Sequence, residues 1–171
     1  MIVRPATARD ISAAFSALSE NSAAEIEAVA ADRATSLSFI EYRLIEALPR
    51  ALFMFALLSS DSARCPGAIM GAWRGANGEV CLAGMTTLWF SDIKRPFWIW
   101  FARRFLPEHV DRCGFRSTAS VMSSQTEWIR LAGRRGFVEV GRHMVAGVEF
   151  TNVERARPAV DGLGARVRSA G

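Results

Sequence analysis

Apolar residues recur along the chain with two different spacings, and their order predicts an α/β domain. Short apolar or alternating runs, typical of strands, cover residues 2–5, 51–58, 68–73, 80–90, 116–122, 137–140 and 144–150. Apolar positions at helical spacing cover residues 8–18, 23–32, 97–112 and 125–133, and a further helix runs from Ser36 or Ser38 to near Pro49. Strands and helices therefore alternate along the chain, as in an α/β fold.

Turn and capping residues punctuate this pattern. Thr7 is an N-cap residue, and Asp10 follows three positions later, where its carboxylate can complete a capping box. The sequence Gly-Ala-Asn-Gly at 75–78 predicts a hairpin turn between two strands. Pro96 suits the first turn of the helix predicted at 97–112, and Pro107 is expected to kink or split this helix. Gly136 follows two arginines, as is common where a helix ends.

The pattern ends near residue 150. Residues 151–171 show little periodicity and carry arginines among Ala, Gly, Pro and Val. We therefore divide the chain into a folded domain at 1–150 and a basic C-terminal tail at 151–171 that stays mobile unless a partner orders it. The arginines of this tail are Arg155, Arg157, Arg166 and Arg168.

Length and composition fit one domain with a sizeable core. The chain has 171 residues, of which 50% are hydrophobic and 22% are charged. The longest apolar run, at 51–58, is far shorter than the roughly 20 residues that cross a bilayer. The N-terminus lacks the pattern of a signal peptide. We expect a cytoplasmic protein, with association to a virion as a further option.

Charge and side-chain chemistry narrow the candidate functions. The formal net charge is +4, and nearly all basic residues are arginine. This bias fits either a GC-rich coding sequence or the binding of phosphate and carboxylate groups. Two histidines and three cysteines without paired spacing predict neither a metal site nor a disulfide framework.

Three stretches, in this order, resemble the GNAT superfamily of N-acyltransferases. They are the opening strand and helix start at 3–11, the hairpin at 71–90 with the helix that follows it, and the helix and Gly-Phe strand entry at 125–137. The resemblance covers residues 2–150 and implies a mixed, mainly antiparallel sheet flanked by helices. Residues 86–92 and 103–105 are more specifically similar to divergent GNAT-like proteins of short-tailed bacteriophages.

The resemblance implies an acyl-coenzyme A site, usually acetyl-CoA, between the fourth and fifth strands. Thr86, Thr87 and Leu88, next to Met85, would line this cleft, where strand backbone can pair with pantetheine amides. The family holds the pyrophosphate on amides of a glycine-containing loop and a helix N-terminus.

The phosphate loop departs from the family pattern. Lys94 or Arg95 would take its basic position, which puts bulky residues where the glycines belong. Pro96 also removes one backbone amide. We therefore expect weak coenzyme A binding. The bulky residues are Phe97, Trp98, Ile99 and Trp100.

The resemblance also places acid and amide groups on the last helix. Gln125 stands at the position of an Asn near the cofactor, and Gly133 stands where the family carries a general-acid Tyr. The one tyrosine, Tyr42, lies in an early helix. Spacing selects no general base, and the catalytic residues stay unassigned. The candidates by type are Glu79, Asp92, Glu127 and His143.

Five consecutive bulky apolar residues at 97–101 exceed what one helix stripe can bury. They would either fill the vacated cofactor cleft or contact a protein partner, and the two readings are compatible. Partner binding is expected through Phe97, Trp98, Trp100 and Phe101 or through the tail arginines, and nucleic acid is the third-ranked partner. Two functions follow: an N-acyltransferase with a degenerate cofactor loop, or a non-catalytic interaction protein, for example in a phage assembly.

Overall fold

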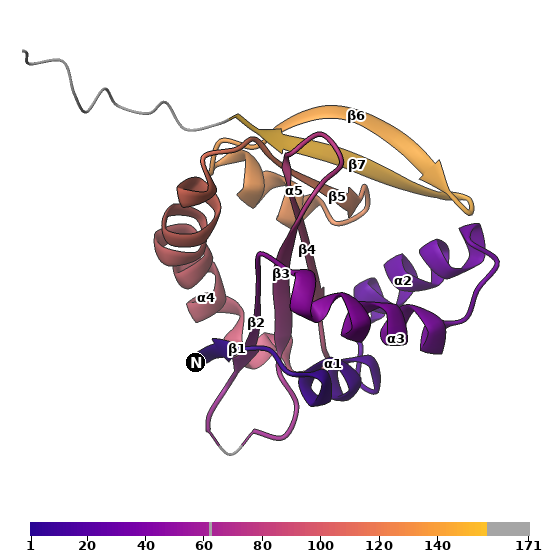
Figure 1. Cartoon of the computed structure of the whole chain (residues 1–171), viewed down its shortest axis with the longest axis vertical. Coiled ribbons are helices and arrows are strands. Elements are labelled where there is room, and N and C mark those ends of the chain that lie inside the picture. Colours follow the sequence, from indigo (N-terminus) through magenta and orange to yellow (C-terminus); the bar gives the residue numbers. More distant parts are fainter. Residues whose placement is uncertain (62, 157–171) are drawn as a thin grey trace, which may run out of the picture.

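The computed structural model describes residues 1–61 and 63–156, and its strands form one seven-stranded sheet (Figure 1). The order across the sheet is β1-β2-β3-β4-β5-β7-β6. All neighbouring strands are antiparallel except β4 and β5, which run parallel, so the mixed, mainly antiparallel sheet is confirmed. The strands are β1 (Ile2–Pro5), β2 (Phe53–Leu58), β3 (Ala68–Arg74), β4 (Val80–Thr86), β5 (Ser117–Met122), β6 (Val138–Val145) and β7 (Val148–Arg155).

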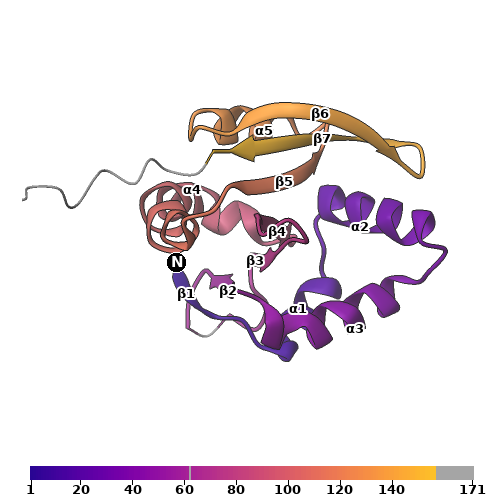
Figure 2. The ribbon, with the colours of Figure 1, turned by 45° about the horizontal axis from the view of Figure 1, so that its top comes forward.

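Helices cover both sides of this sheet. α4 lies on one side of the strands β1 to β4, and α1 and α3 lie on the other (Figures 1 and 2). α2 contacts β4 and β6 and lies between the two halves of the sheet (Figure 2). A π-helical segment, Phe101–Val110, continues α4. The α-helices are α1 (Ala8–Phe15), α2 (Glu20–Asp32), α3 (Leu37–Ala47), α4 (Phe90–Trp100) and α5 (Thr126–Gly133).

Two main clusters of apolar side chains form the core. The larger one packs α4, its π-helical continuation and α5 against the sheet, with Phe97 and Phe105 fully buried at its centre. The second one packs α1 and α3 on the other side around Ile11. Burial of whole aromatic side chains contributes roughly 2–3 kcal/mol each, so the larger cluster is a main source of stability.

The N-terminal capping box is confirmed. Thr7 and Asp10 exchange the two hydrogen bonds of the motif, and Arg4 from β1 adds a bidentate ion pair to Asp10 with N–O distances of 2.7 Å. Burial raises the pKa of Asp10, but the hydrogen bonds from Arg4 and Thr7 outweigh it and hold this pKa below its usual range. The box thereby fixes β1 to the start of α1.

The junction between β4 and α4 corrects the sequence expectation. β4 ends at Thr86 rather than at Phe90, and α4 begins at Phe90 rather than at Phe97. The buried Thr87 causes the early turn, because its carbonyl accepts from the Phe90 N–H at 3.0 Å and its hydroxyl from the Trp89 N–H at 3.3 Å. Pro96 therefore lies inside the helix and not at its first turn.

The C-terminal hairpin is also longer than expected. β6 and β7 each span 8 residues and are joined at Ala146-Gly147, where both residues have positive φ, as in a two-residue primed turn. β7 continues to Arg155, so the sequence boundary at residue 150 is wrong. Arg155 forms an ion pair with Asp111 and belongs to the domain. Arg157, Arg166 and Arg168 lie outside the described residues.

In the part of the chain that the structure describes, no helix combines the length and the apolar character needed to cross a membrane.

Phe137 should be a main anchor of the last helix, because its side chain is 5% exposed and packs in the larger cluster with Trp128 of α5. We expect Phe137→Ala to lower the free energy of unfolding by about 3–5 kcal/mol in chemical denaturation. The exposed neighbour Val138 supplies the control, since Val138→Ala should change stability by less than about 0.5 kcal/mol. A loss below about 1 kcal/mol for Phe137→Ala would contradict this packing.

Candidate functional site

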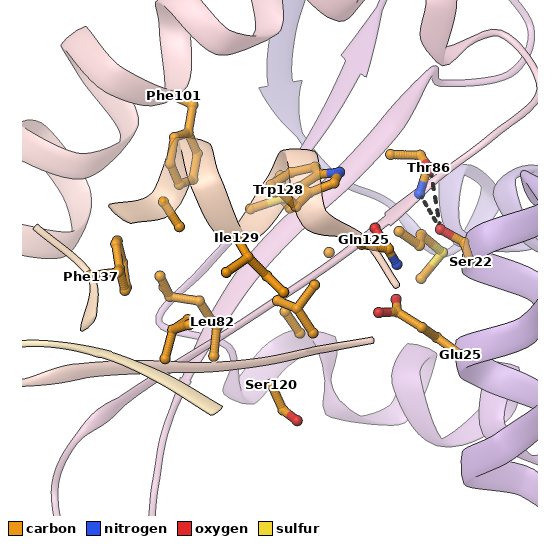
Figure 3. A pocket seen from close by; sticks show the side chains of 18 residues that line it. Ser22, Glu25, Leu82, Thr86, Phe101, Ser120, Gln125, Trp128, Ile129 and Phe137 are labelled. Atoms are coloured by element: carbon orange, nitrogen blue, oxygen red, sulfur yellow. Dashed lines mark hydrogen bonds between the residues drawn. The ribbon is translucent and has the colours of Figure 1, made fainter. Parts of the chain in front are cut away.

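A narrow cavity of about 90 Å³ lies where β4 and β5 separate (Figure 3). The two parallel strands pair only at Val80–Ser117 and Cys81–Thr118 and then diverge. Side chains from α2, α5 and the start of the π-helical segment close the space between them. We call this space the slot. Its principal lining residues are Ser22, Glu25, Met70, Leu82, Gly84, Met85, Thr86, Phe101, Ser120, Gln125, Trp128, Ile129 and Phe137.

Gly84 turns an unpaired peptide group toward the slot from β4. Hydrogen bonds of an extended strand point alternately to its two edges. Thr87 donates its N–H toward β3, to the Gly67 carbonyl, whereas Val80 and Thr86 donate theirs on the β5 side. Gly84 is an even number of positions from both Val80 and Thr86, so its N–H and C=O groups also point toward β5. At this position the β4–β5 ladder has already ended, which leaves these groups without a partner strand.

Ser120 turns an unpaired peptide group toward the slot from β5. The Ser123 N–H bonds the Glu149 carbonyl on β7, whereas the Met122 N–H points to the other edge, where Glu25 accepts it. Ser120 is two positions before Met122 on the same strand, so its N–H and C=O groups point to the same edge, toward β4. The slot thus has polar backbone on both walls, which can bind a ligand that carries amide groups.

One turn of α2 spans the open ends of both strands. The Ser22 hydroxyl accepts the Thr86 N–H at 2.9 Å, and the Glu25 carboxylate accepts the Met122 N–H at 2.8 Å. These side chains are three residues apart and therefore lie on one helix face. They satisfy the last amides of β4 and β5 and fix the distance between the two strands.

The polar and apolar groups of the slot are separated. Figure 3 shows Ser22, Glu25, Thr86 and Gln125 at one end and aromatic and aliphatic side chains toward the other. Among the described lining residues, Glu25 is the only one with a charge. Burial raises the pKa of Glu25, and the hydrogen bond from the Met122 N–H opposes this shift without cancelling it.

The structure brings together only some of the residues expected at the cofactor site. Thr86 and Gln125 line the slot. Thr87 is buried beside it and donates its hydroxyl to the Pro66 carbonyl at 2.8 Å, while the Leu88 side chain is 68% exposed. Lys94 and Arg95 do not line the slot; they are placed in the second turn of α4.

The residues expected to form the phosphate loop lie inside α4. The turn between β4 and α4 is at residues 87–89, and it contains no glycine. Lys94 forms an ion pair with Glu127 of α5 at 2.7 Å. The predicted roles of Lys94 and Arg95 in binding phosphate stay predictions.

The aromatic residues at 97–101 are mostly part of the core. Phe97 and Phe101 are buried, which removes them from any contact surface, whereas the Ile99 side chain is 50% exposed. Trp98 packs edge-on against Trp128 of α5 with a ring-centroid distance of 4.4 Å. This contact and the Lys94–Glu127 ion pair close the gap between α4 and α5. A partner that contacts Trp98, Trp100 or the tail stays a prediction.

None of the general-base candidates selected by residue type lines the slot. Glu127 is bound to Lys94, Glu79 lies in the β3–β4 hairpin, and His143 contacts Asn152 on the surface. Asp92 is exposed in the first turn of α4. Sequence reasoning missed Glu25, which lies in the helix predicted at 23–32 without any local signal that it reaches β5. The long-range contact with Met122 has no sequence signature.

Solved structures establish the fold. AAC(6')-Ib in complex with ribostamycin and coenzyme A matches with a TM-score of 0.61 and 13% identity, over 99% of this chain and 98% of that one. A GNAT superfamily phosphinothricin acetyltransferase from Sinorhizobium meliloti in complex with AcCoA has a TM-score of 0.59 and 16% identity over 91% and 88%. This chain has the GNAT acetyltransferase fold.

Further matches agree with this GNAT fold. The ribosomal-protein-alanine N-acetyltransferase from Brucella melitensis has a TM-score of 0.58 and 12% identity, over 91% of this chain and 99% of that one. No family model and no curated protein matches the sequence. At these identities, the likeness extends to the fold and not to the activity.

The occupied amides of the β4–α4 turn predict weak binding of acetyl-CoA. Because they already bond within the protein, we expect a dissociation constant above about 1 mM, which corresponds to less than about 4 kcal/mol of binding free energy. Isothermal titration calorimetry on the purified chain measures this value. A micromolar isotherm would contradict the prediction.

Proposed function

We propose that this chain transfers an acyl group from a thioester to an amine in the slot between β4 and β5. The observation that carries the proposal is the pairing of two features at one place. The slot offers unpaired peptide groups of Gly84 and Ser120 to an amide-bearing thioester arm, and it ends at Glu25, the one ionisable residue among its described lining residues. Titratable groups with perturbed pKa values in a pocket are the usual candidates for proton transfer.

The reaction requires one proton acceptor. The amine nitrogen attacks the thioester carbonyl carbon, the new C–N bond forms, and the C–S bond breaks to release a thiolate. The attacking nitrogen loses a proton to Glu25, which then releases it to solvent, and the thiolate takes a proton from solvent. The products are an amide and a free thiol.

Glu25 is held in the orientation that this role needs. Its Oε1 atom accepts the Met122 N–H at 2.8 Å, and among the described residues its Oε2 atom has no hydrogen-bond partner. A carboxylate whose pKa is raised by burial is a stronger base than an exposed one. The oriented, desolvated carboxylate can therefore accept a proton from an amine that reaches the polar end of the slot.

The general acid of the resemblance is missing here. Gly133 stands where the family carries its tyrosine, and Tyr42 is 59% exposed on α3 and does not line the slot. Thr86 hydrogen-bonds through its hydroxyl to Ser19 and Ser22 at 2.7 and 3.2 Å. We therefore assign no side chain to protonation of the thiolate, which is a good leaving group without one.

A second candidate function is a non-catalytic protein on the same fold. The closed gap between α4 and α5, with Trp98 packed on Trp128, favours it. In this form the chain would act in an assembly, for example of a short-tailed bacteriophage, and associate with a virion or with cytoplasmic partners. The phage origin rests on the similarity of residues 86–92 and 103–105. Absence of any turnover with amines and thioesters would favour this function.

Replacement of Glu25 by glutamine tests the catalytic proposal. Glutamine keeps an oxygen for the Met122 N–H but cannot accept the proton, so Glu25→Gln should lower kcat/KM by about a hundred- to ten-thousandfold. Because the pKa of Glu25 is raised, kcat/KM of the wild type should rise with pH through a midpoint above the usual carboxyl range. This limb should vanish in the variant, as measured by release of free thiol.

Stability measurements separate a chemical from a structural role. The raised pKa means that ionisation of Glu25 weakens the native state, so wild-type stability falls as pH rises through this pKa. Glu25→Gln should therefore be at least as stable as the wild type at neutral pH. The exposed Glu27 on the same helix gives the control, and Glu27→Gln should leave kcat/KM unchanged. Full activity of Glu25→Gln would exclude Glu25 as the base.

A further inference from the structure

We propose that this chain recognises its acyl donor through the pantetheine arm alone and makes no use of the nucleotide of coenzyme A. The substrate class is thus an acyl thioester of pantetheine, whatever is attached to the other end of the arm. This inference rests on the proposed function, because it takes the slot as the thioester site. It follows from a comparison of the hydrogen-bonding capacity of the slot with that of the β4–α4 turn.

The backbone amides at the start of α4 are already used. A helix N-terminus binds phosphate through amides that have no partner within the protein. Here the Thr87 N–H donates to the Gly67 carbonyl at 3.0 Å, and the Leu88 N–H to the Ala17 carbonyl at 3.0 Å. The Trp89 N–H donates to the Thr87 hydroxyl at 3.3 Å.

The amides of the first helical residues also have partners within the protein. The Phe90 N–H donates to the Thr87 carbonyl at 3.0 Å, and the Asp92 N–H donates to the Trp89 carbonyl at 3.2 Å. Five of the six amides from Thr87 to Asp92 are therefore occupied. The turn cannot hold a pyrophosphate in the way that the GNAT resemblance implies.

The α1–α2 connection holds this turn in place. Leu18 forms a β-bridge with Thr87, and the Ser19 N–H donates to the Thr86 carbonyl at 2.9 Å. To free the Leu88 amide for a phosphate, its bond to the Ala17 carbonyl would have to break, and the α1–α2 connection would separate from the end of β4. Several hydrogen bonds would be lost to gain one phosphate contact.

Charge and side-chain bulk at the start of α4 also oppose the binding of a nucleotide. Asp92 places a carboxylate in the first turn of α4, where a phosphate would come. Trp89, which is 46% exposed, places a bulky side chain immediately before the first turn of α4. The Lys94 ammonium is bound to Glu127. Each feature weakens a nucleotide site at this helix end.

The slot has the opposite properties. The peptide groups of Gly84 and Ser120 face it without partners in the sheet, and its lining becomes apolar away from the end that holds Ser22 and Glu25. A Cβ at position 84 would meet the Met70 Sδ atom at 2.3 Å, so glycine leaves room for the Met70 side chain in the slot lining. An arm with two amides and an apolar chain matches this polarity.

The decisive experiment compares donors on the wild-type chain. Turnover is measured with acetyl-CoA and with acetyl-pantetheine, using free thiol release with a primary amine. We expect the two kcat/KM values to agree within about threefold, since the nucleotide would add little transition-state stabilisation. Adenosine 3′,5′-bisphosphate should not inhibit the turnover of either donor. A preference for acetyl-CoA above about thirtyfold would overturn the inference.

Binding distinguishes this inference from the proposed function. NMR titrations with pantetheine and with coenzyme A should give similar dissociation constants and shift the same slot resonances, even if no turnover occurs. Ala119→Leu, which fills the slot from β5, should weaken both ligands equally, whereas Ala31→Leu on the exposed end of α2 should not. Turnover that needs the nucleotide contradicts only the inference. Pantetheine binding without turnover contradicts only the catalytic proposal, and no pantetheine binding contradicts both.

Discussion

Two side chains on one turn of α2 determine the shape of the whole site. Ser22 binds the last amide of β4 and Glu25 binds an amide at the end of β5, so the helix keeps the two strands apart where their ladder has ended. Without these contacts, two buried amides would lose their partners, each at a cost of about 1–3 kcal/mol. The gap between the strands, the exposed peptide groups that line it and the burial of the carboxylate all depend on this one turn.

Much of the fold could be predicted because local sequence patterns determine it. The capping box at Thr7 and Asp10, the hairpin at 75–78 and the alternation of strands with helices involve residues close in sequence. The β4–α4 junction could not be predicted in the same way. The bonds of Thr87 to Pro66 and Gly67 that end the strand join residues about twenty positions apart, and Pro96 gave a misleading local signal for a helix start.

The site was less predictable than the fold for a related reason. Thr86 and Gln125 could be placed at the cleft because the resemblance gives their position in the strand and helix order. Glu25 could not, because its proximity to β5 depends on how the helix α2 crosses the sheet. Residue type alone selected carboxylates that the structure shows at the surface, and burial, which raises the pKa of Glu25, is a tertiary property.

The same two contacts have a consequence for how the chain folds. Ser22 and Thr86 are 64 positions apart, and Glu25 and Met122 are 97 apart. Such non-local contacts need large loops to close before they are formed, which slows folding relative to local hairpins. The β6–β7 hairpin and the N-terminal helices can form early from neighbouring residues. The opening between the parallel strands is completed only when the first and last thirds of the molecule meet, so the slot is assembled late and belongs to the slowest step of folding.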